Sequence, residues 1–163
     1  MRVIGVTGWK DQGKTTLVAA LVRHFTGEGL SVSTIKHAHA GFDIDQPGRD
    51  SFRHREAGAR EVVLASPRRV AVMEELRSAP EPTLGTLLAR MQTVDLVVVE
   101  GYKDAPHPKI EVYREDRGKP PLALTRPTIR AVAGTAAGFA LPVPVLPIDD
   151  IPGLAAIALR EAE

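Results

Sequence analysis

The eight residues GWKDQGKT at positions 8–15 constrain the fold more than any other feature of the chain. They match the pattern G-x-x-x-x-G-K-[ST] at every fixed position. The apolar run Val3–Thr7 precedes them, and apolar residues at helical spacing follow from Leu17 to Phe25. A strand, a glycine-bounded turn and a helix in this order form the setting in which the pattern binds phosphate.

The chemistry of this turn explains its residue types. Glycine frees the backbone so that consecutive N–H groups converge on phosphate oxygens, and the start of the helix adds unpaired N–H groups and a positive dipole end. The Lys14 ammonium is expected to contact the β- and γ-phosphates, and the Thr15 hydroxyl to ligate Mg²⁺. The segment therefore predicts a nucleoside triphosphate site. A chance glycine turn is the other interpretation, and the flanking strand and helix argue against it.

The order of the remaining segments predicts an α/β fold. Leu30–Lys36 completes a strand–helix–strand unit, which builds parallel sheets. Val94–Glu100 is apolar on both faces, as in a central parallel strand covered by helices on both sides. We predict a three-layer P-loop NTPase fold with a mainly parallel central sheet and a short inserted β-hairpin, formed as a single domain by residues 1–163. The other expected elements are helices at Asp50–Ala59, Thr83–Met91 and after Asp149 or Asp150, a hairpin of Glu61–Ala65 with Arg69–Met73, and strands at Lys109–Tyr113, Ile129–Ala133 and Val143–Leu146.

Composition excludes several classes of protein and site. Twenty-one basic and 20 acidic residues leave a net charge of +1, whereas broad contact with nucleic acid needs a clustered basic excess. The chain has no cysteine, and therefore no disulfide, thiolate metal site or cysteine nucleophile. No apolar run reaches the length of about 18 residues that crosses a bilayer, and no signal-peptide pattern opens the sequence. We expect a cytoplasmic protein that binds neither nucleic acid nor membrane.

Acidic residues that follow two of the strands are candidates for a magnesium site. Glu100 ends the buried strand, and ligands of open parallel sheets lie at the carboxyl ends of strands. We expect Glu100 to hold Mg²⁺ or its water, in preference to being a solvated acid at a strand end. The connection Lys36–Asp50 has the length of a lid or switch. Its carboxylates are candidates for a second magnesium ligand or for activating a water; they are Asp43, Asp45 and Asp50.

Other polar groups leave their roles open. His37 and His39, with His24 and His54, suit a transition metal, but a histidine pair alone lacks the third ligand of a complete site. Six arginines from Arg49 to Arg69 suit an anionic partner, and a solvated helix face explains them equally well. The N-K-x-D box common in GTPases is absent. The residues themselves therefore predict a nucleoside triphosphate without specifying its base.

Several segments occur together in an order that resembles the MobB family of molybdopterin-guanine dinucleotide biosynthesis accessory proteins. They are the loop of residues 8–16, IKH at 35–37, GFDID at 41–45, DSFRHREAGA at 50–59 and VEGYK at 99–103. The resemblance extends from Met1 to about Tyr113 and continues less specifically to the C-terminal helix. The DSFRHREAGA and VEGYK segments are far more specific than the glycine loop.

The resemblance implies a homodimeric GTP-binding protein with weak intrinsic GTPase activity, which assists the guanylyltransferase MobA in joining GMP to Mo-molybdopterin. It implies GTP and Mg²⁺ as cofactors and allows a contact with molybdopterin. The residues implied to bind nucleotide are Gly8, Lys10, Asp11, Gln12, Gly13, Lys14, Thr15 and Thr16. The residues implied at the metal are Thr15, Asp45 and Glu100, and those implied to serve hydrolysis are Lys14, Asp45 and Glu100.

Two other functions remain open from the sequence. A small-molecule kinase shares the loop and the length, and the region Arg53–Arg69 resembles an arginine-rich lid. A metallochaperone NTPase would use His37 and His39. Turnover accelerated by an acceptor would indicate the kinase, and tight, histidine-dependent binding of Ni²⁺ or Zn²⁺ would indicate the metallochaperone. Because the sequence contains no certain catalytic base and no assigned arginine finger, we expect slow hydrolysis.

Overall fold

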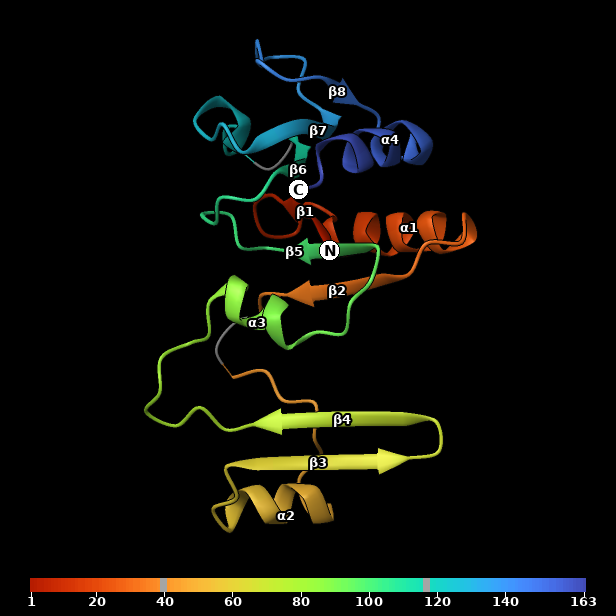
Figure 1. Cartoon of the computed structure of the whole chain (residues 1–163). Coiled ribbons are helices and arrows are strands. Elements are labelled where there is room, and N and C mark those ends of the chain that lie inside the picture. The colour runs from red at the N-terminus through yellow and green to blue at the C-terminus, as the bar shows by residue number, and fades with distance from the viewer. Residues whose placement is uncertain (39–40, 116–117) are drawn as a thin grey trace. The chain divides into compact units, whose positions relative to one another are not determined.

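The computed structural model describes residues 1–38, 41–115 and 118–163, and the chain forms two compact units (Figure 1). The first unit comprises residues 1–37 and 91–163, and the second comprises residues 38–90. The second unit is thus an insertion in the sequence of the first. The assignment of residues 1–163 to a single domain stays a prediction.

The first unit is built on a six-stranded sheet in which each neighbouring pair of strands is parallel. Its strands are β1 (Arg2–Thr7), β2 (Val32–Lys36), β5 (Leu96–Glu100), β6 (Lys109–Arg114), β7 (Ile129–Thr135) and β8 (Val145–Leu146). Their order across the sheet is β2-β5-β1-β6-β7-β8. Parallel neighbours require crossover connections, and these carry the carboxyl ends of all the strands to one edge.

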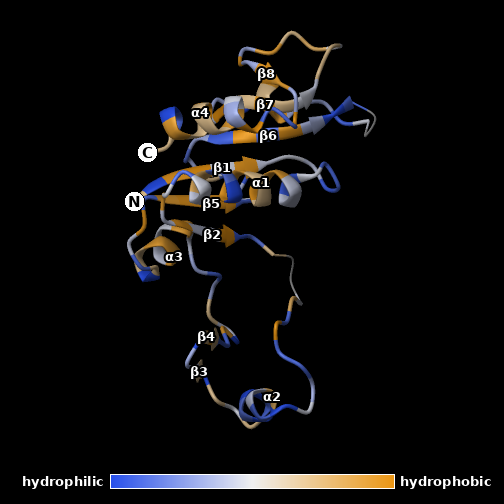
Figure 2. Cartoon of the chain, turned by 90° about the vertical axis from the view of Figure 1, so that its right-hand side faces the viewer, coloured by the Kyte–Doolittle hydropathy of each residue, from blue (hydrophilic) through white to orange (hydrophobic). Residues whose placement is uncertain are grey.

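Burial explains why β1 and β5 lie in the interior of the sheet. All five residues of β5 are buried, and β1 is buried from Val3 to Thr7; both strands are hydrophobic along most of their length (Figure 2). A strand that is apolar on both faces gains stability only where both faces are covered. The two strands end at Thr7 and Glu100, which places these residues at the carboxyl edge.

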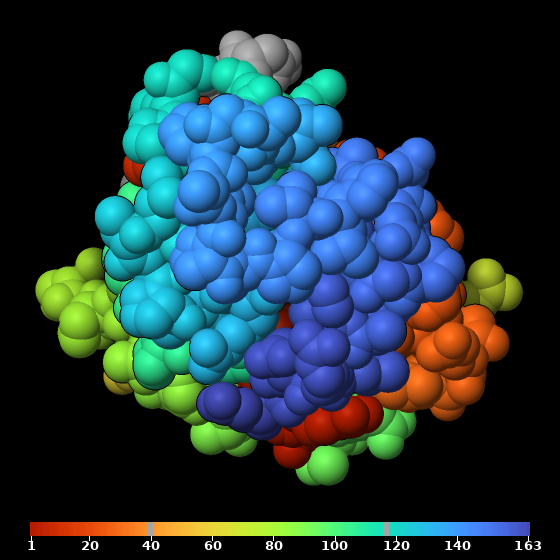
Figure 3. Space-filling model, turned by 90° about the horizontal axis from the view of Figure 1, so that it is seen from above, coloured from red at the N-terminus to blue at the C-terminus, as the bar shows by residue number. Residues whose placement is uncertain are grey.

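Two helices pack on one face of this sheet. They are α1 (Lys14–Gly27) and α4 (Ile151–Glu161), which lie side by side (Figure 3). Leu17 and Phe25 of α1 are buried in one core with Leu154 of α4 and the apolar residues of the strands. The Asp150 carboxylate accepts a hydrogen bond from the Gly153 N–H at 3.1 Å. This contact identifies Asp150 as the N-cap, out of the two predicted candidates.

Buried charged residues of β6 shape the opposite face. Lys109 is fully buried, and its ammonium donates hydrogen bonds to the carbonyls of Ala105 and His107. Burial lowers the pKa of Lys109 to about 8. Glu111 is also fully buried and accepts two N–H groups from the 3₁₀ helix Leu122–Leu124, while burial raises its pKa. Both residues therefore anchor the loops that cover this face.

The second unit contains two short helices and an antiparallel hairpin. Its elements are α2 (Asp50–Glu56), β3 (Glu61–Ser66), β4 (Arg69–Glu74) and α3 (Leu84–Arg90). Val62 pairs with Met73 and both are buried, whereas Val63 pairs with Val72 and both are exposed. Because side chains alternate between the faces of a strand, the exposed valines share one face with Val70. The hairpin therefore presents an apolar face to solvent.

The predicted α/β class, the parallel sheet and the inserted hairpin are confirmed. Several elements are shorter than predicted: β2, β5 and α3 lose one or two residues at one or both ends, and two others lose a larger share of their length. The helix expected over Asp50–Ala59 ends at Glu56, close to Gly58 with its φ of 109°. The strand expected at Val143–Leu146 has two residues, because proline at positions 142, 144 and 147 removes backbone donors around it. No helix in the described ranges is long and apolar enough to span a membrane.

Candidate functional site

The carboxyl ends of three neighbouring strands meet at the candidate site. β1 continues into the loop of residues 8–13, β5 ends at Glu100 and β2 ends at Lys36. Glu100 lies opposite Val6 of β1 on one side and opposite Lys36 of β2 on the other. Partners in adjacent strands project their side chains from the same face. The sheet thus brings together three segments that are far apart in the sequence.

The backbone of the loop uses glycine where other residues would be strained. Gly8 and Gly13 have φ values of 139° and 98°, in the region that L-residues rarely adopt. A Cβ atom on Gly8 would overlap the carbonyl oxygen of Val112 in β6. Gly13 occupies the N-cap position of α1. The loop therefore runs close against the sheet and presents the first turn of α1, with its unpaired N–H groups, at the carboxyl edge.

Lys14 folds back over this loop. Its ammonium donates a hydrogen bond to the carbonyl of Trp9 at 2.7 Å. Partial burial lowers the pKa of Lys14, while the carboxylates of Glu100 and Asp11 act in the opposite direction. An ammonium group has three donors, and the described structure uses one of them in this bond. The remaining donors can bind phosphate oxygens.

Thr15 and Glu100 form a close pair of oxygen ligands. The Thr15 hydroxyl donates a hydrogen bond to Glu100 Oε1 at 2.9 Å, and Glu100 is 8% exposed. Mg²⁺ takes oxygen ligands at about 2.0–2.1 Å in an octahedron, so that adjacent ligands lie about 2.9 Å apart. The chemistry and the spacing of the two oxygens therefore fit neighbouring positions around Mg²⁺. Sequence reasoning predicted both residues, and the structure brings them together.

Lys36 also contacts this pair, although sequence reasoning did not assign it to the site. Its Nζ atom lies 3.4 Å from Thr15 Oγ1 and 3.4 Å from Glu100 Oε1. The Lys36 side chain is 58% exposed, whereas that of Glu100 is 10% exposed. The IKH segment contained the residue, but the contact depends on β2 lying next to β5, which no sequence motif indicates.

The other residues predicted to bind nucleotide lie in the same loop and the first turn of α1. Three of them are exposed: Lys10, Asp11 and Thr16. Gln12 is fully buried, and its amide has no hydrogen-bond partner among the described residues. The indole N–H of Trp9 donates to the carbonyl of Pro120 at 2.9 Å. This bond ties the loop to the segment that follows β6.

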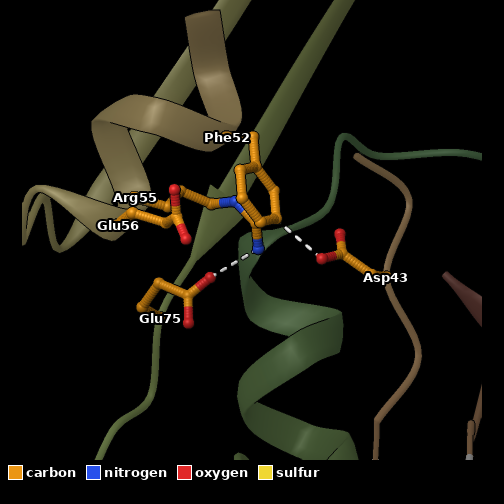
Figure 4. Close-up of a pocket in the computed structure, with 5 residues that line it drawn as sticks. All are labelled: Asp43, Phe52, Arg55, Glu56 and Glu75. Atoms are coloured by element: carbon orange, nitrogen blue, oxygen red, sulfur yellow. Dashed lines mark hydrogen bonds and ion pairs between the residues drawn. The ribbon is translucent and has the colours of Figure 1, made fainter. Parts of the chain in front are cut away.

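The carboxylates predicted downstream of β2 belong to the second unit, where Asp43 and Asp45 bind an arginine and Asp50 begins α2. Arg55 donates hydrogen bonds to Asp43 and to Glu75, each at 2.7 Å, and lies between them in a small pocket (Figure 4). The bond from Arg55 holds the pKa of Asp43 below its usual range. Asp45 accepts from Ser51 at 2.9 Å and from Arg55 at 3.3 Å. The assignment of Asp45 to Mg²⁺ and to hydrolysis stays a prediction.

The histidines have other contacts. His37 stacks on Tyr102 with ring centroids 4.6 Å apart, and His24 lies 3.3 Å from Glu28 in α1. His39 lies outside the described residues. Within the described ranges, no group of three histidine, cysteine, aspartate or glutamate side chains is placed to hold a metal ion. The metallochaperone alternative, which depends on His37 and His39, stays a hypothesis.

Comparison with known proteins decides the family. The family model for molybdopterin guanine dinucleotide synthesis protein B matches residues 3–135. The chain belongs to the MobB family. The molybdopterin-guanine dinucleotide biosynthesis adapter protein of Escherichia coli K12 is 36% identical, over 94% of this chain and 89% of its own length. The protein of the same name from Haemophilus influenzae is 40% identical, over 72% of this chain and 66% of its own length.

Solved structures of MobB proteins share the fold of this MobB-family chain. A MobB homologue from Bacillus stearothermophilus has a TM-score of 0.70 at 28% identity, and the match covers 97% of this chain and 98% of that one. Bacillus subtilis MobB has a TM-score of 0.74, over 100% of this chain and 99% of its own, and at 22% identity it supports the fold alone. The family resemblance predicted from the sequence is thus confirmed.

Proposed function

We propose that this MobB-family chain is a nucleotide-binding adapter in molybdopterin-guanine dinucleotide biosynthesis, which binds GTP with Mg²⁺ and assists the guanylyltransferase MobA. Family membership and the names of its relatives support the adapter role. One observation carries the nucleotide site. The oxygens of Thr15 and Glu100 lie 2.9 Å apart at the start of α1, beside the ammonium of Lys14.

Each part of this site has a separate task in the proposal. The N–H groups of the loop and of the first turn of α1 bind phosphate oxygens, and Lys14 adds a positive charge. Thr15 and Glu100 hold Mg²⁺, which neutralises charge on the β- and γ-phosphates when it is bound. The sequence identifies no certain catalytic base and no arginine finger, the two parts that speed phosphoryl transfer in related enzymes. Turnover below about 1 s⁻¹, the low end of ordinary enzyme rates, is therefore expected.

Calorimetry with GTP, GDP and ATP, each with Mg²⁺ and each with and without the guanylyltransferase, tests the proposal. We expect GTP to bind more tightly than ATP, and bound GTP to change the affinity for the guanylyltransferase. Equal binding of ATP and GTP would contradict guanine selectivity. Nucleotide binding that leaves the affinity for the guanylyltransferase unchanged would contradict the coupling that an adapter needs.

We also infer that the chain forms a homodimer through the exposed face of its hairpin. We call this face the Val63–Val70–Val72 face, after the residues that it carries. These three valines are 55%, 64% and 56% exposed. A cluster of exposed β-branched residues on a two-stranded hairpin gains stability when a second copy covers it, and the hairpin edges have unpaired backbone groups. The family resemblance independently implies a homodimer.

Val72→Lys should weaken this dimer by about tenfold or more, because a charged side chain would have to be buried at the interface. Sedimentation velocity over a range of protein concentrations measures the change. Leu64→Lys is the matched control, since Leu64 is 44% exposed and, by strand alternation, lies on the opposite face of the same hairpin. Equal weakening by both variants, or by neither, would remove this face from the interface.

A further inference from the structure

The ammonium of Lys36 lies against the two oxygens that suit Mg²⁺. It lies 3.4 Å from the hydroxyl oxygen of Thr15 and 3.4 Å from Glu100 Oε1. Glu100 is 8% exposed, and a carboxylate so deeply buried is costly unless a positive charge accompanies it. Register in the sheet fixes this arrangement, since Lys36 and Glu100 are direct partners across β2 and β5.

We propose that Lys36 is the built-in counter-cation of the metal site. Its ammonium neutralises the charge of Glu100 beside Thr15 in the nucleotide-free protein, and it leaves these two residues when nucleotide and Mg²⁺ bind together. This inference rests on the proposed function, because it assumes that Thr15 and Glu100 hold the metal. It assigns Lys36 a positioning role that concerns metal occupancy, distinct from the phosphate-binding role of Lys14.

Electrostatics requires the exchange. Two cations that share one carboxylate oxygen repel each other at short range, so Lys36 and a divalent ion compete for Glu100. Lys36 is the partner that can move, because its side chain is 58% exposed and carries the ammonium at the end of a flexible chain. Thr15 is fixed in the first turn of α1, and Glu100 ends a strand that is buried throughout.

The triphosphate makes the exchange favourable. Its negative charges offer the displaced ammonium a new partner and add oxygen ligands for the metal. Without nucleotide, a divalent ion that enters alone would leave Lys36 without its carboxylate partner. Metal and nucleotide should therefore bind cooperatively in the wild-type protein, and Lys36 should be the main source of this cooperativity.

Binding of Mn²⁺ as a probe, followed by electron paramagnetic resonance in the absence of nucleotide, tests the proposal. Lys36→Met should bind Mn²⁺ about fivefold or more tightly than wild type, the size expected from removing one nearby charge at a partly exposed site. Lys36→Arg, which keeps the charge, should stay close to wild type. Lys119→Met is the matched control, because it removes one exposed lysine charge that lies over the Trp9 ring and does not pair with Glu100.

A second titration, with saturating GTP, completes the test. The difference in Mn²⁺ affinity between wild type and Lys36→Met should shrink or reverse, because the Lys36 ammonium then binds the phosphates of GTP and no longer competes with the metal. Equal Mn²⁺ affinity of both proteins without nucleotide would overturn the proposal, and so would an increase matched by Lys119→Met. Failure of the proposed function would look different. In that case the wild-type protein would bind no GTP in calorimetry, whatever its affinity for Mn²⁺.

Discussion

Lys14→Ala should weaken the binding of GTP with Mg²⁺ by at least about 100-fold, the largest functional effect expected of a single substitution in this chain. The Lys14 ammonium is partly buried and has two donors left for phosphate oxygens. Hydrogen bonds between charged groups in such a site contribute about 1.5–3 kcal/mol each, and 100-fold in affinity corresponds to about 2.7 kcal/mol. Isothermal titration calorimetry measures the effect directly.

The fold should survive this substitution. Lys14 makes one hydrogen bond in the described structure, to the carbonyl of Trp9, and this bond contributes about 1 kcal/mol. Circular dichroism and urea unfolding should therefore show a folded protein close to wild-type stability. Lys10→Ala is the comparison, because it removes the same charge from an exposed position in the same loop and should lower affinity far less. Wild-type GTP affinity in Lys14→Ala would disprove the assignment of the loop to phosphate.

The part of the site that sequence could predict is the part whose residues are fixed by local chemistry. The glycine pattern predicts the turn after β1, because few other residues adopt the φ values of Gly8 and Gly13. The carboxyl end of an apolar strand predicts the place of Glu100, since parallel strands end at one edge. Neither argument needs to know which strands are neighbours.

Lys36 could not be assigned in this way, because its contact depends on strand order. β2 lies next to β5 and not next to β1, and this order brings Lys36 beside Glu100 across 64 positions of sequence. A lysine at the end of an edge strand is otherwise indistinguishable from an exposed surface residue. The IKH segment carries a resemblance to the family, but its sequence does not indicate this contact.

The buried charges of β6 were missed for a different reason. Ile110 and Val112 alternate with Lys109 and Glu111, a pattern that is typical of a strand with one face in solvent. In the structure both polar side chains are fully buried, because each binds backbone groups of a loop that covers the sheet. Local periodicity cannot distinguish a solvated polar face from one whose partners are backbone groups of the loops before and after the strand.

Gly134→Ala should lower the free energy of unfolding by about 3 kcal/mol or more, the largest effect on stability expected from adding a single methyl group. Gly134 lies in β7 with a φ of 136°, and a Cβ atom there would overlap the backbone carbonyl oxygen of Tyr113 in the neighbouring strand. A side chain in this backbone region costs about 1–2 kcal/mol, and overlap inside a packed sheet adds a further 1–3 kcal/mol. Urea unfolding measures the sum.

Gly29→Ala separates the two contributions. Gly29 has a φ of 86°, and a Cβ atom there would meet nothing within 4 Å. The substitution Gly29→Ala therefore measures the backbone contribution alone, a loss of about 1 kcal/mol in the free energy of unfolding. The overlap at Gly134 cannot be relieved by a side-chain rotation, because the atom in the way belongs to the backbone of β6, between β1 and β7. If both variants lost the same stability, the close approach of β6 and β7 at Gly134 would be disproved, and with it the register that aligns Tyr113 with this glycine.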